Sequence, residues 1–325
     1  MLAVLTYRFV ERPIHDWRRS RRLRNVPVLA SMLAACLLIG SVKYAWSLYV
    51  APRLLPAVTG LEPPAVGAAS YPPTAHRGLL LGDSHATVLA SGAEDYVRRA
   101  GASWTVTARG YCPPLLHIDI VDPSGERNET CNKLFGSVDF SDSEFLVVTA
   151  RWNLYLGLPW SELYYRQYGL TDEQAGAIPA DPIELMRRGL AATLAAAKQG
   201  GVRRILVVGP LPEFPLHPPS CLVRALRLGV DDCMVDRASV DARRARTMEM
   251  LRRVTQGIEG TRLIDPIDVF CDATTCWPHS GRMLYFFDSN HLSPAGIERF
   301  LHAFESDFRW ALTGEQADAR ARPPP

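Results

Sequence analysis

Short apolar runs alternate with longer amphipathic segments through the central part of this 325-residue chain. Short continuous runs fit buried strands, whereas apolar positions spaced three and four residues apart fit helices. The predicted strands lie at 78–81, 103–107, 145–149, 205–208 and 262–264. The predicted helices lie at 86–100, 182–199, 239–257 and 294–311. This alternation predicts an α/β layered domain with a mainly parallel sheet.

A different pattern precedes this domain. Residues 26–42 carry no charge and an aromatic cluster follows Lys43, so the stretch 26–50 is long enough for a membrane-spanning helix. The basic block at 17–24 has no counterpart after the span, and the positive-inside rule therefore places the N-terminus in the cytoplasm. A signal peptide and a buried core helix are the alternatives. The apolar run starts too far from the N-terminus for a typical signal peptide, and a buried core helix would leave the flanking charges unexplained.

Net charge is unevenly divided along the chain. The total is +2, but residues 1–24 hold seven arginines and only two acidic residues, which leaves a net −3 for the remainder. A chain without a basic domain is not typical of a general nucleic-acid binder, so no nucleic-acid partner is expected. We expect a single-pass inner-membrane protein with a cytoplasmic stub at 1–25 and a periplasmic domain.

Composition divides the exported part into three segments. Residues 51–76 contain six prolines, which predicts an extended stalk. The segment 313–325 has too few apolar residues to bury and predicts a disordered tail. The folded domain is therefore expected at 77–312.

Six of the seven cysteines lie beyond the predicted span, which holds Cys36. An even number in an exported domain suggests disulfide bonds, and nearest-neighbour pairing is one of fifteen possible connectivities. Those neighbouring pairs are Cys112 with Cys131, Cys221 with Cys233, and Cys271 with Cys276. The alternative is a zinc site built from Cys271, Cys276 and His279, which lacks an evident fourth ligand.

The first predicted strand ends in Gly-Asp-Ser-His, residues 82–85, directly before a helix. In α/β folds chemistry gathers beyond the carboxyl ends of the strands. Ser84 would then stand at a strand-to-helix turn, surrounded by the free backbone N–H groups of a helix N-terminus. The alternative is that Ser84 or Asp83 only caps the helix.

A second motif near the chain end complements this serine. Asp288-Ser289-Asn290-His291 precedes the last predicted helix. A hydroxyl nucleophile needs a base, and the base needs an orienting acid. Asp288 can accept a hydrogen bond from His291 and leave the other ring nitrogen for Ser84.

The Gly-Asp-Ser-His turn and the terminal Asp-x-x-His-Leu-Ser together resemble the SGNH (GDSL-like) hydrolase family. The resemblance covers roughly 77–312 and implies a three-layer α/β fold with Ser84, Asp288 and His291 as a catalytic triad. The family's oxyanion hole uses the serine N–H, a glycine and an asparagine, and Gly110 fits the glycine. The third position departs from the usual Gly-x-Asn, because Ala-Arg-Trp-Asn stands there, so either Asn153 or Arg151 is expected to stabilise the oxyanion.

A second resemblance lies at the N-terminus, where residues 7–14 read YRFVERPI. This segment is similar to the end of the integral-membrane acyltransferase family 3 domain, which often continues into one more membrane helix and an exported SGNH domain. The resemblance implies such a domain as partner, either lost through a late chain start or present as a separate polypeptide. The alternative is a basic helix lying on an anionic membrane surface.

These resemblances imply O-acyl transfer, most simply acetyl transfer, to hydroxyls of a surface polysaccharide or lipopolysaccharide through a Ser84 acyl-enzyme. One alternative is an exported carbohydrate or lipid esterase, which has the same triad and uses water as the acceptor. Another is a non-catalytic module that positions a glycan. The sequence has no glycine-rich nucleotide loop and no spaced metal cluster, so no cofactor is expected.

Overall fold

The computed structural model describes residues 35–36, 38–42, 59, 71–121, 127–156, 169–172 and 181–315. The chain divides into two compact units, Met1–Pro56 and Ala57–Pro325. The second unit contains the predicted α/β domain and is described below. No helix among the described residues is long and apolar enough to cross a membrane. Most of the predicted span at 26–50, the stalk at 51–76 and the tail at 313–325 lie outside the described residues.

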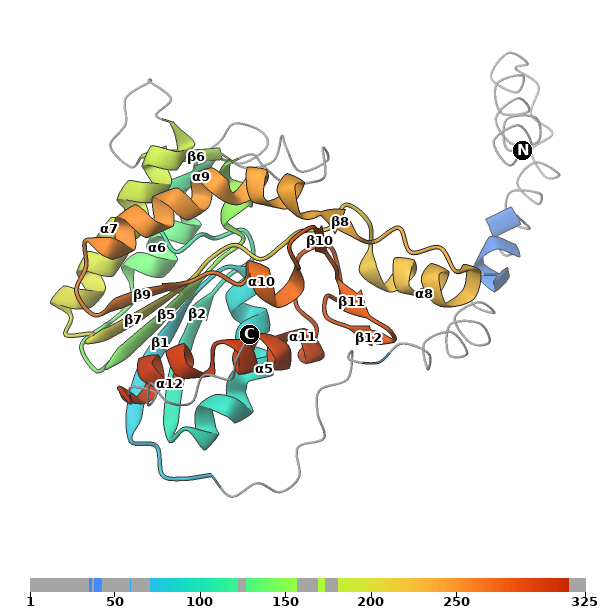
Figure 1. Cartoon of the computed structure of the whole chain (residues 1–325). Helices are drawn as coiled ribbons and strands as arrows, with labels where there is room; N and C mark the ends of the chain where they lie inside the picture. The colour runs from blue at the N-terminus through green and yellow to red at the C-terminus, as the bar shows by residue number, and fades with distance from the viewer. Residues whose placement is uncertain are drawn as a thin grey trace, which may run out of the picture. The chain divides into compact units, whose positions relative to one another are not determined.

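The core of the domain is a five-stranded sheet in the order β2-β1-β5-β7-β9 (Figure 1). All four neighbouring pairs are parallel. The strands are β1 (His76–Gly82), β2 (Ala102–Ala108), β5 (Phe145–Thr149), β7 (Arg204–Val208) and β9 (Thr261–Ile264). Each contains one of the predicted apolar runs, so the prediction of an α/β domain with a mainly parallel sheet is confirmed.

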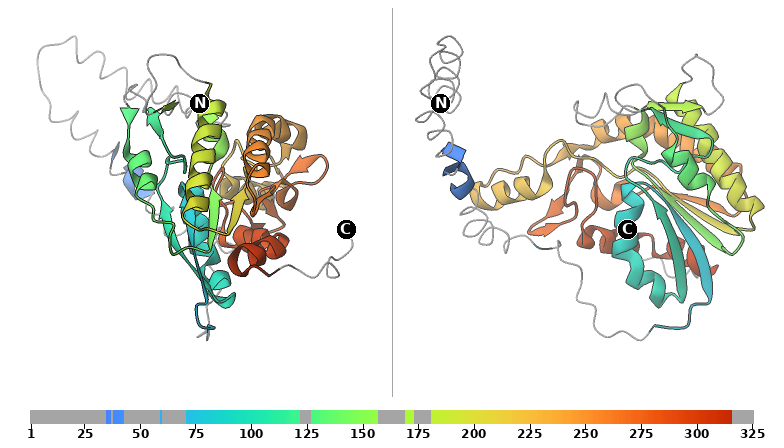
Figure 2. Two further views of the ribbon diagram at one scale, coloured as in Figure 1. Left: turned by 90° about the vertical axis from the view of Figure 1, so that its left-hand side faces the viewer. Right: turned by 180° about the vertical axis from the view of Figure 1, so that it is seen from behind.

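Helices cover both faces of this sheet, and the alternation of side chains along the strands explains why (Figure 2). Leu79 and Leu81 of β1 pack into one apolar cluster, whereas Leu80 between them packs into the other. The first cluster includes α7 (Pro182–Gln199) and α9 (Arg237–Gln256). The second includes α5 (Ser84–Arg99), α11 (Pro294–Ala303) and α12 (Glu305–Thr313). Parallel strands buried on both faces read as continuous apolar runs, as these do.

The remaining elements are short and lie mostly in the connections. A second sheet has the order β4-β3-β6, and two short antiparallel pairs join β10 to β8 and β11 to β12. The elements are β3 (Ile118–Val121), β4 (Arg127–Asn128), α6 (Thr130–Gly136), a 3-10 helix η4 (Trp152–Leu156), β6 (Gly169–Asp172), α8 (Pro218–Leu228), β8 (Val235–Asp236), α10 (Ile267–Phe270), β10 (Thr275–Cys276), β11 (His279–Ser280) and β12 (Met283–Leu284).

The continuous helix predicted at 294–311 is wrong. The structure breaks it at Phe304, whose φ of −112° and ψ of 25° are not helical, and the chain continues as α12. The break lets both pieces bury aromatic rings in one cluster, where Phe300 meets Phe308 edge-on at 5.6 Å between ring centroids. Tertiary packing overrides a local pattern that is compatible with one longer helix.

The structure confirms nearest-neighbour pairing of the six cysteines. Disulfides join Cys112 to Cys131, Cys221 to Cys233, and Cys271 to Cys276. The third bond uses both sulfurs of the zinc alternative, so neither is available as the thiolate that zinc requires.

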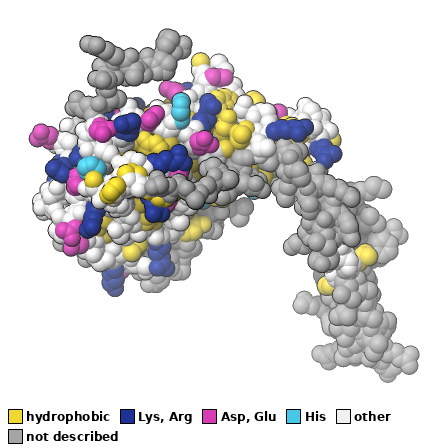
Figure 3. Space-filling view, turned by 90° about the horizontal axis from the view of Figure 1, so that it is seen from below, with side chains coloured by type: hydrophobic (Ala, Val, Ile, Leu, Met, Phe, Trp, Pro, Cys, Tyr) yellow, Lys and Arg dark blue, Asp and Glu magenta, His cyan; other side chains and the backbone are white. Residues whose placement is uncertain are grey.

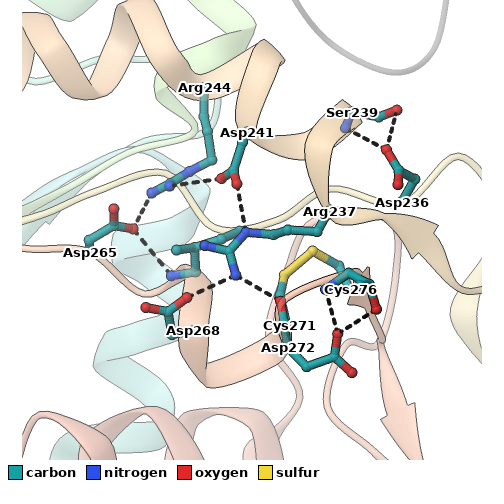
Figure 4. Close-up of polar contacts among 12 residues, drawn as sticks. Asp236, Arg237, Ser239, Asp241, Arg244, Asp265, Asp268, Cys271, Asp272 and Cys276 are labelled. Atoms are coloured by element: carbon teal, nitrogen blue, oxygen red, sulfur yellow. Dashed lines mark hydrogen bonds and ion pairs between the residues drawn. A yellow bond between two sulfur atoms is a disulfide. The ribbon is translucent and has the colours of Figure 1, made fainter.

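An ion pair joins the start of α9 to α10, and a hydrogen bond joins it to the following loop, which carries the third disulfide (Figure 4). Arg237 contacts Asp241 at 2.7 Å and Asp268 at 2.9 Å, and it donates a hydrogen bond to the backbone oxygen of Asp272. Arg244, about two turns further along α9, pairs with Asp265, which directly follows β9. Elsewhere, acidic and basic side chains are interspersed on the face seen from below (Figure 3).

Candidate active site

The nucleophile turn connects β1 to α5. Asp83 caps the helix, because its side chain accepts a hydrogen bond from the backbone N–H of His85 at 2.9 Å. Ser84 is therefore the first helical residue rather than the cap. Gly82 permits the tight approach of β1 to β5, since a Cβ at this position would lie 1.8 Å from the carbonyl oxygen of Thr149.

Ser84, His291 and Asp288 form one continuous hydrogen-bonded chain. The Ser84 hydroxyl lies 2.8 Å from His291 Nε2, and His291 Nδ1 lies 2.7 Å from Asp288 Oδ2. Asp288 Oδ1 also accepts the backbone N–H groups of Asn290 and His291. The structure thus brings together the three residues that the two motifs predict, although 207 positions separate serine and histidine.

The surroundings of Asp288 favour its ionised form. Partial burial alone would raise the pKa of Asp288, but the His291 ring and two backbone N–H groups outweigh it and lower this pKa to about 2. Asp288 is therefore a carboxylate at neutral pH, and it accepts a hydrogen bond from His291 Nδ1. His291 Nε2 then faces Ser84 as an acceptor, which is the geometry of a general base.

Asp83 does more than cap the helix. Its second carboxylate oxygen accepts hydrogen bonds from the backbone N–H of Arg151 at 2.8 Å and the Tyr155 hydroxyl at 2.7 Å. Burial and the nearby Asp83 raise the pKa of Tyr155 well above its usual value, so this phenol stays protonated as a donor. Asp83 therefore ties the nucleophile turn to the chain that follows β5.

Two candidate oxyanion residues lie beside Ser84 on the cleft wall, and a third does not. Gly110 and Arg151 both line the cleft that contains Ser84 and His291. Arg151 is nearly buried and forms two hydrogen bonds with Glu213, from Nε at 3.2 Å and Nη2 at 2.6 Å. Asn153 is buried, its side-chain oxygen accepts from Thr247 at 2.7 Å, and it is not among the described residues that line the cleft.

The cleft has a volume of about 560 Å³, which is in the range of small-molecule sites. Its walls carry aromatic and aliphatic side chains next to the triad. Phe287, which is not among the described residues that line the cleft, stacks on the His291 ring with a centroid distance of 5.5 Å. The other lining residues include Tyr111, Leu154, Phe214, Leu216 and His217. A cleft of mixed apolar and polar lining around a serine nucleophile is suited to acyl chemistry on a polar acceptor.

Sequence reasoning missed several polar residues that organise this site. Glu213 follows the end of β7, and the rule that chemistry gathers at strand ends could have found it. Tyr155 lies in η4, where nothing distinguishes it from an ordinary core aromatic. His85 and Asn290 stand inside the two motifs, but their buried contact joins segments that are 205 residues apart and leaves no local pattern.

Among the described residues, two further groups of side chains have ligand atoms close enough together for a metal ion, but both include a disulfide-bonded sulfur. One contains Cys221, Asp232 and Cys233, and the other contains Asp231, Cys233 and His279. A disulfide sulfur is not the thiolate that a transition metal needs. Neither group is therefore a candidate metal centre.

A family model for the SGNH domain that is fused to AT3 domains matches residues 58–306. The chain belongs to this family. The matched range begins 19 residues before the predicted domain start at residue 77 and includes both triad motifs. A search of the curated proteins found no significant relative of this SGNH chain.

Solved structures resemble this chain at low sequence identity. The periplasmic domain of a lipopolysaccharide acetyltransferase from Salmonella ser. Paratyphi A is 17% identical with a TM-score of 0.50, and the match covers 83% of this chain and 98% of that one. A Streptococcus pneumonia protein provisionally described as a platelet activating factor is 11% identical with a TM-score of 0.41, over 87% of this chain and 99% of that one. The first match confirms the fold.

Proposed function

We propose that this domain transfers an acyl group, most simply acetyl, to hydroxyls of a cell-surface polysaccharide or lipopolysaccharide through a covalent Ser84 intermediate. The observation that carries the proposal is the unbroken hydrogen-bonded chain from Ser84 through His291 to Asp288 at the wall of a cleft. Membership of a family of SGNH domains fused to AT3 domains supports it. The similar fold of a lipopolysaccharide acetyltransferase periplasmic domain agrees with it.

The reaction follows from the positions of the protons. His291 Nε2 takes the Ser84 proton while the serine oxygen attacks the acyl carbonyl, and a tetrahedral oxyanion forms. The donor's leaving group departs with that proton, so an ester on Ser84 and a neutral His291 remain. An acceptor hydroxyl then gives its proton to His291 and attacks the ester, and Ser84 leaves and recovers the proton. General acid–base catalysis of this kind contributes roughly 10²–10⁴-fold to the rate.

For the oxyanion we propose the backbone N–H groups of Ser84 and Gly110 together with the Arg151 guanidinium. Arg151 lines the cleft and Glu213 holds it in a fixed orientation, whereas the Asn153 side chain contacts Thr247. One preorganised donor in such a hole is worth about 3–4 kcal/mol in the transition state. This assignment makes Arg151, rather than Asn153, the third stabilising group.

The acyl donor and the location are part of the same proposal. An integral-membrane acyltransferase 3 domain, as fused in this family, would supply the acyl group across the inner membrane. The single-pass anchor at 26–50 would then keep the SGNH domain in the periplasm beside that partner. Three disulfides agree with an oxidising compartment.

The test is the Ser84→Ala variant of the full chain, compared with wild type for labelling by a fluorophosphonate probe and for acetylation of surface glycan in cells. The proposal predicts that the variant stays folded, is not labelled at this position and no longer supports acetylation. Normal acetylation by a well-expressed Ser84→Ala variant would contradict the proposal. Acyl release to water alone, with no transfer to added sugars, would identify an esterase instead, and absent labelling of folded wild type would favour a non-catalytic module.

A further inference from the structure

A second hydrogen bond runs beside the catalytic one. Ser84 contacts His291, and their chain neighbours His85 and Asn290 contact each other, with His85 Nε2 3.1 Å from Asn290 Oδ1. Both neighbours are buried, with His85 7% and Asn290 5% exposed. Two adjacent side-chain bonds therefore link the start of α5 to the Asp288–His291 turn.

Asn290 is well placed to control this turn. Its backbone N–H donates to Asp288 Oδ1 and its side-chain NH₂ donates to the Ser289 hydroxyl, so the amide oxygen is directed toward His85. Because that oxygen can only accept, His85 Nε2 carries the proton. The His85 backbone N–H is in turn held by Asp83. The contact is fixed at both ends by other bonds.

His85 keeps this donor role over a wide pH range. Burial lowers the pKa of His85 to about 4, with Asp83 and the Asn290 hydrogen bond opposing this effect and with His291 and Arg151 adding to it. At neutral pH His85 is therefore uncharged, although its ring centroid lies only 5.0 Å from that of His291. A second positive charge beside a catalytic imidazolium is thus avoided.

The catalytic hydrogen bond cannot hold the turn throughout the reaction. Once Ser84 carries an ester, its oxygen has no proton to donate, and the bond to His291 is lost. We propose that His85 and Asn290 are a positioning pair, which keeps the His291 ring in place beside Ser84 until the acceptor reacts with the acyl-enzyme. The inference rests on the proposed function, because it requires the Ser84 ester.

This role has a kinetic signature. Before acylation, His291 is placed both by Ser84 and by the positioning pair, but in the acyl-enzyme the pair acts without Ser84. Loss of the pair therefore slows breakdown of the acyl-enzyme more than its formation. Misplacement of a catalytic group by about 1 Å can cost roughly 10²-fold in rate. We expect the ratio of deacylation to acylation to fall about tenfold or more when His85 cannot donate.

The experiment uses full-length His85→Leu, His85→Gln and Asn290→Leu variants with p-nitrophenyl acetate as the donor. Rapid quenching and mass spectrometry follow growth of acetyl-Ser84, and its decay is followed after the donor is removed. His85→Leu and Asn290→Leu should each lower the decay rate relative to the formation rate. His85→Gln keeps an N–H donor and should restore most of the ratio, and the double Leu variant should add little to either single change.

Different outcomes separate the two claims. If wild type forms no acetyl-Ser84, the proposed function fails. If wild type forms it but both rates fall equally in the Leu variants, or His85→Gln behaves like His85→Leu, the positioning inference is overturned alone. Thermal unfolding of each variant shows which variants are folded. If His85→Leu does not fold, Asn290→Leu still tests the pair, because it removes the acceptor of the same hydrogen bond.

Discussion

The Glu213→Ala substitution tests how Arg151 is held at the cleft. The Arg151 side chain is 10% exposed and that of Glu213 is 7% exposed. Removing the carboxylate takes the Glu213 charge and both of its hydrogen bonds away from a buried guanidinium. Unit charges about 4 Å apart at an effective dielectric of about 20 interact by roughly 4 kcal/mol. Breaking buried pairs costs about 3–5 kcal/mol in other proteins, a large part of a typical stability of about 5–15 kcal/mol.

A matched control lies on the surface of the same domain. Arg187 and Glu184 on α7 make the same two-bond contact, at 2.7 Å and 2.6 Å, but about half of each side chain is exposed. Glu184→Ala should cost at most about 1 kcal/mol, because solvent screens exposed pairs. Urea unfolding of the disulfide-intact full chain measures both costs. A Glu213→Ala cost equal to that of Glu184→Ala would refute the reasoning.

The double variant Arg151→Met/Glu213→Leu separates folding from chemistry. Replacing both partners by apolar side chains of similar size removes both charges of this pair and should restore stability to near that of wild type. If Arg151 stabilises the oxyanion, this stable variant should still lose roughly 10²-fold or more in acylation of Ser84 by p-nitrophenyl acetate. Wild-type acylation in the double variant would remove Arg151 from the proposed mechanism.

The remaining predictions concern the frame of the site. Replacing Cys112 and Cys131 by serine should cost about 3 kcal/mol in urea unfolding, given their separation of 19 residues, whereas an unchanged midpoint would show that the bond does not stabilise the fold. Gly82→Ala should destabilise the β1–β5 contact by at least about 1–3 kcal/mol, since its Cβ meets the Thr149 carbonyl, and wild-type stability would refute this close approach. Asp288 has a depressed pKa, so it contributes stability above about pH 4 that is lost as pH falls through about 2. The stability difference from Asp288→Asn, on the order of 1 kcal/mol after solvent screening, should shrink between these pH values, and a constant difference would contradict it.

The sheet and the helices on its two faces were predictable because local patterns determine them. The run 145–149 coincides with β5 and the segment 182–199 coincides with α7, where Asp181 caps the helix by accepting from Ile183 N–H. Both elements bury continuous apolar surface, which is visible in the sequence. The break at Phe304 was not predictable, because the local pattern is compatible with one longer helix.

The site was predictable only where its motifs are compact. Ser84 and the Asp288–His291 turn each stand in a short recognisable block, and the fold brings the blocks together. The Arg151–Glu213 pair and the Asn153–Thr247 bond join side chains 62 and 94 positions apart, so neither follows from spacing. Whether Asn153 or Arg151 faces the cleft depends on those long-range partners.

The most direct test of the account is to locate the acyl group. Full-length wild-type protein is incubated with p-nitrophenyl acetate, quenched in acid, digested and analysed by tandem mass spectrometry, with His291→Ala as the matched control. The account predicts one acetyl group on Ser84 in wild type and almost none in the control, because His291 removes the serine proton. Turnover by wild type without acetyl on Ser84, or acetyl on a different residue that His291→Ala leaves unchanged, would contradict the central claim.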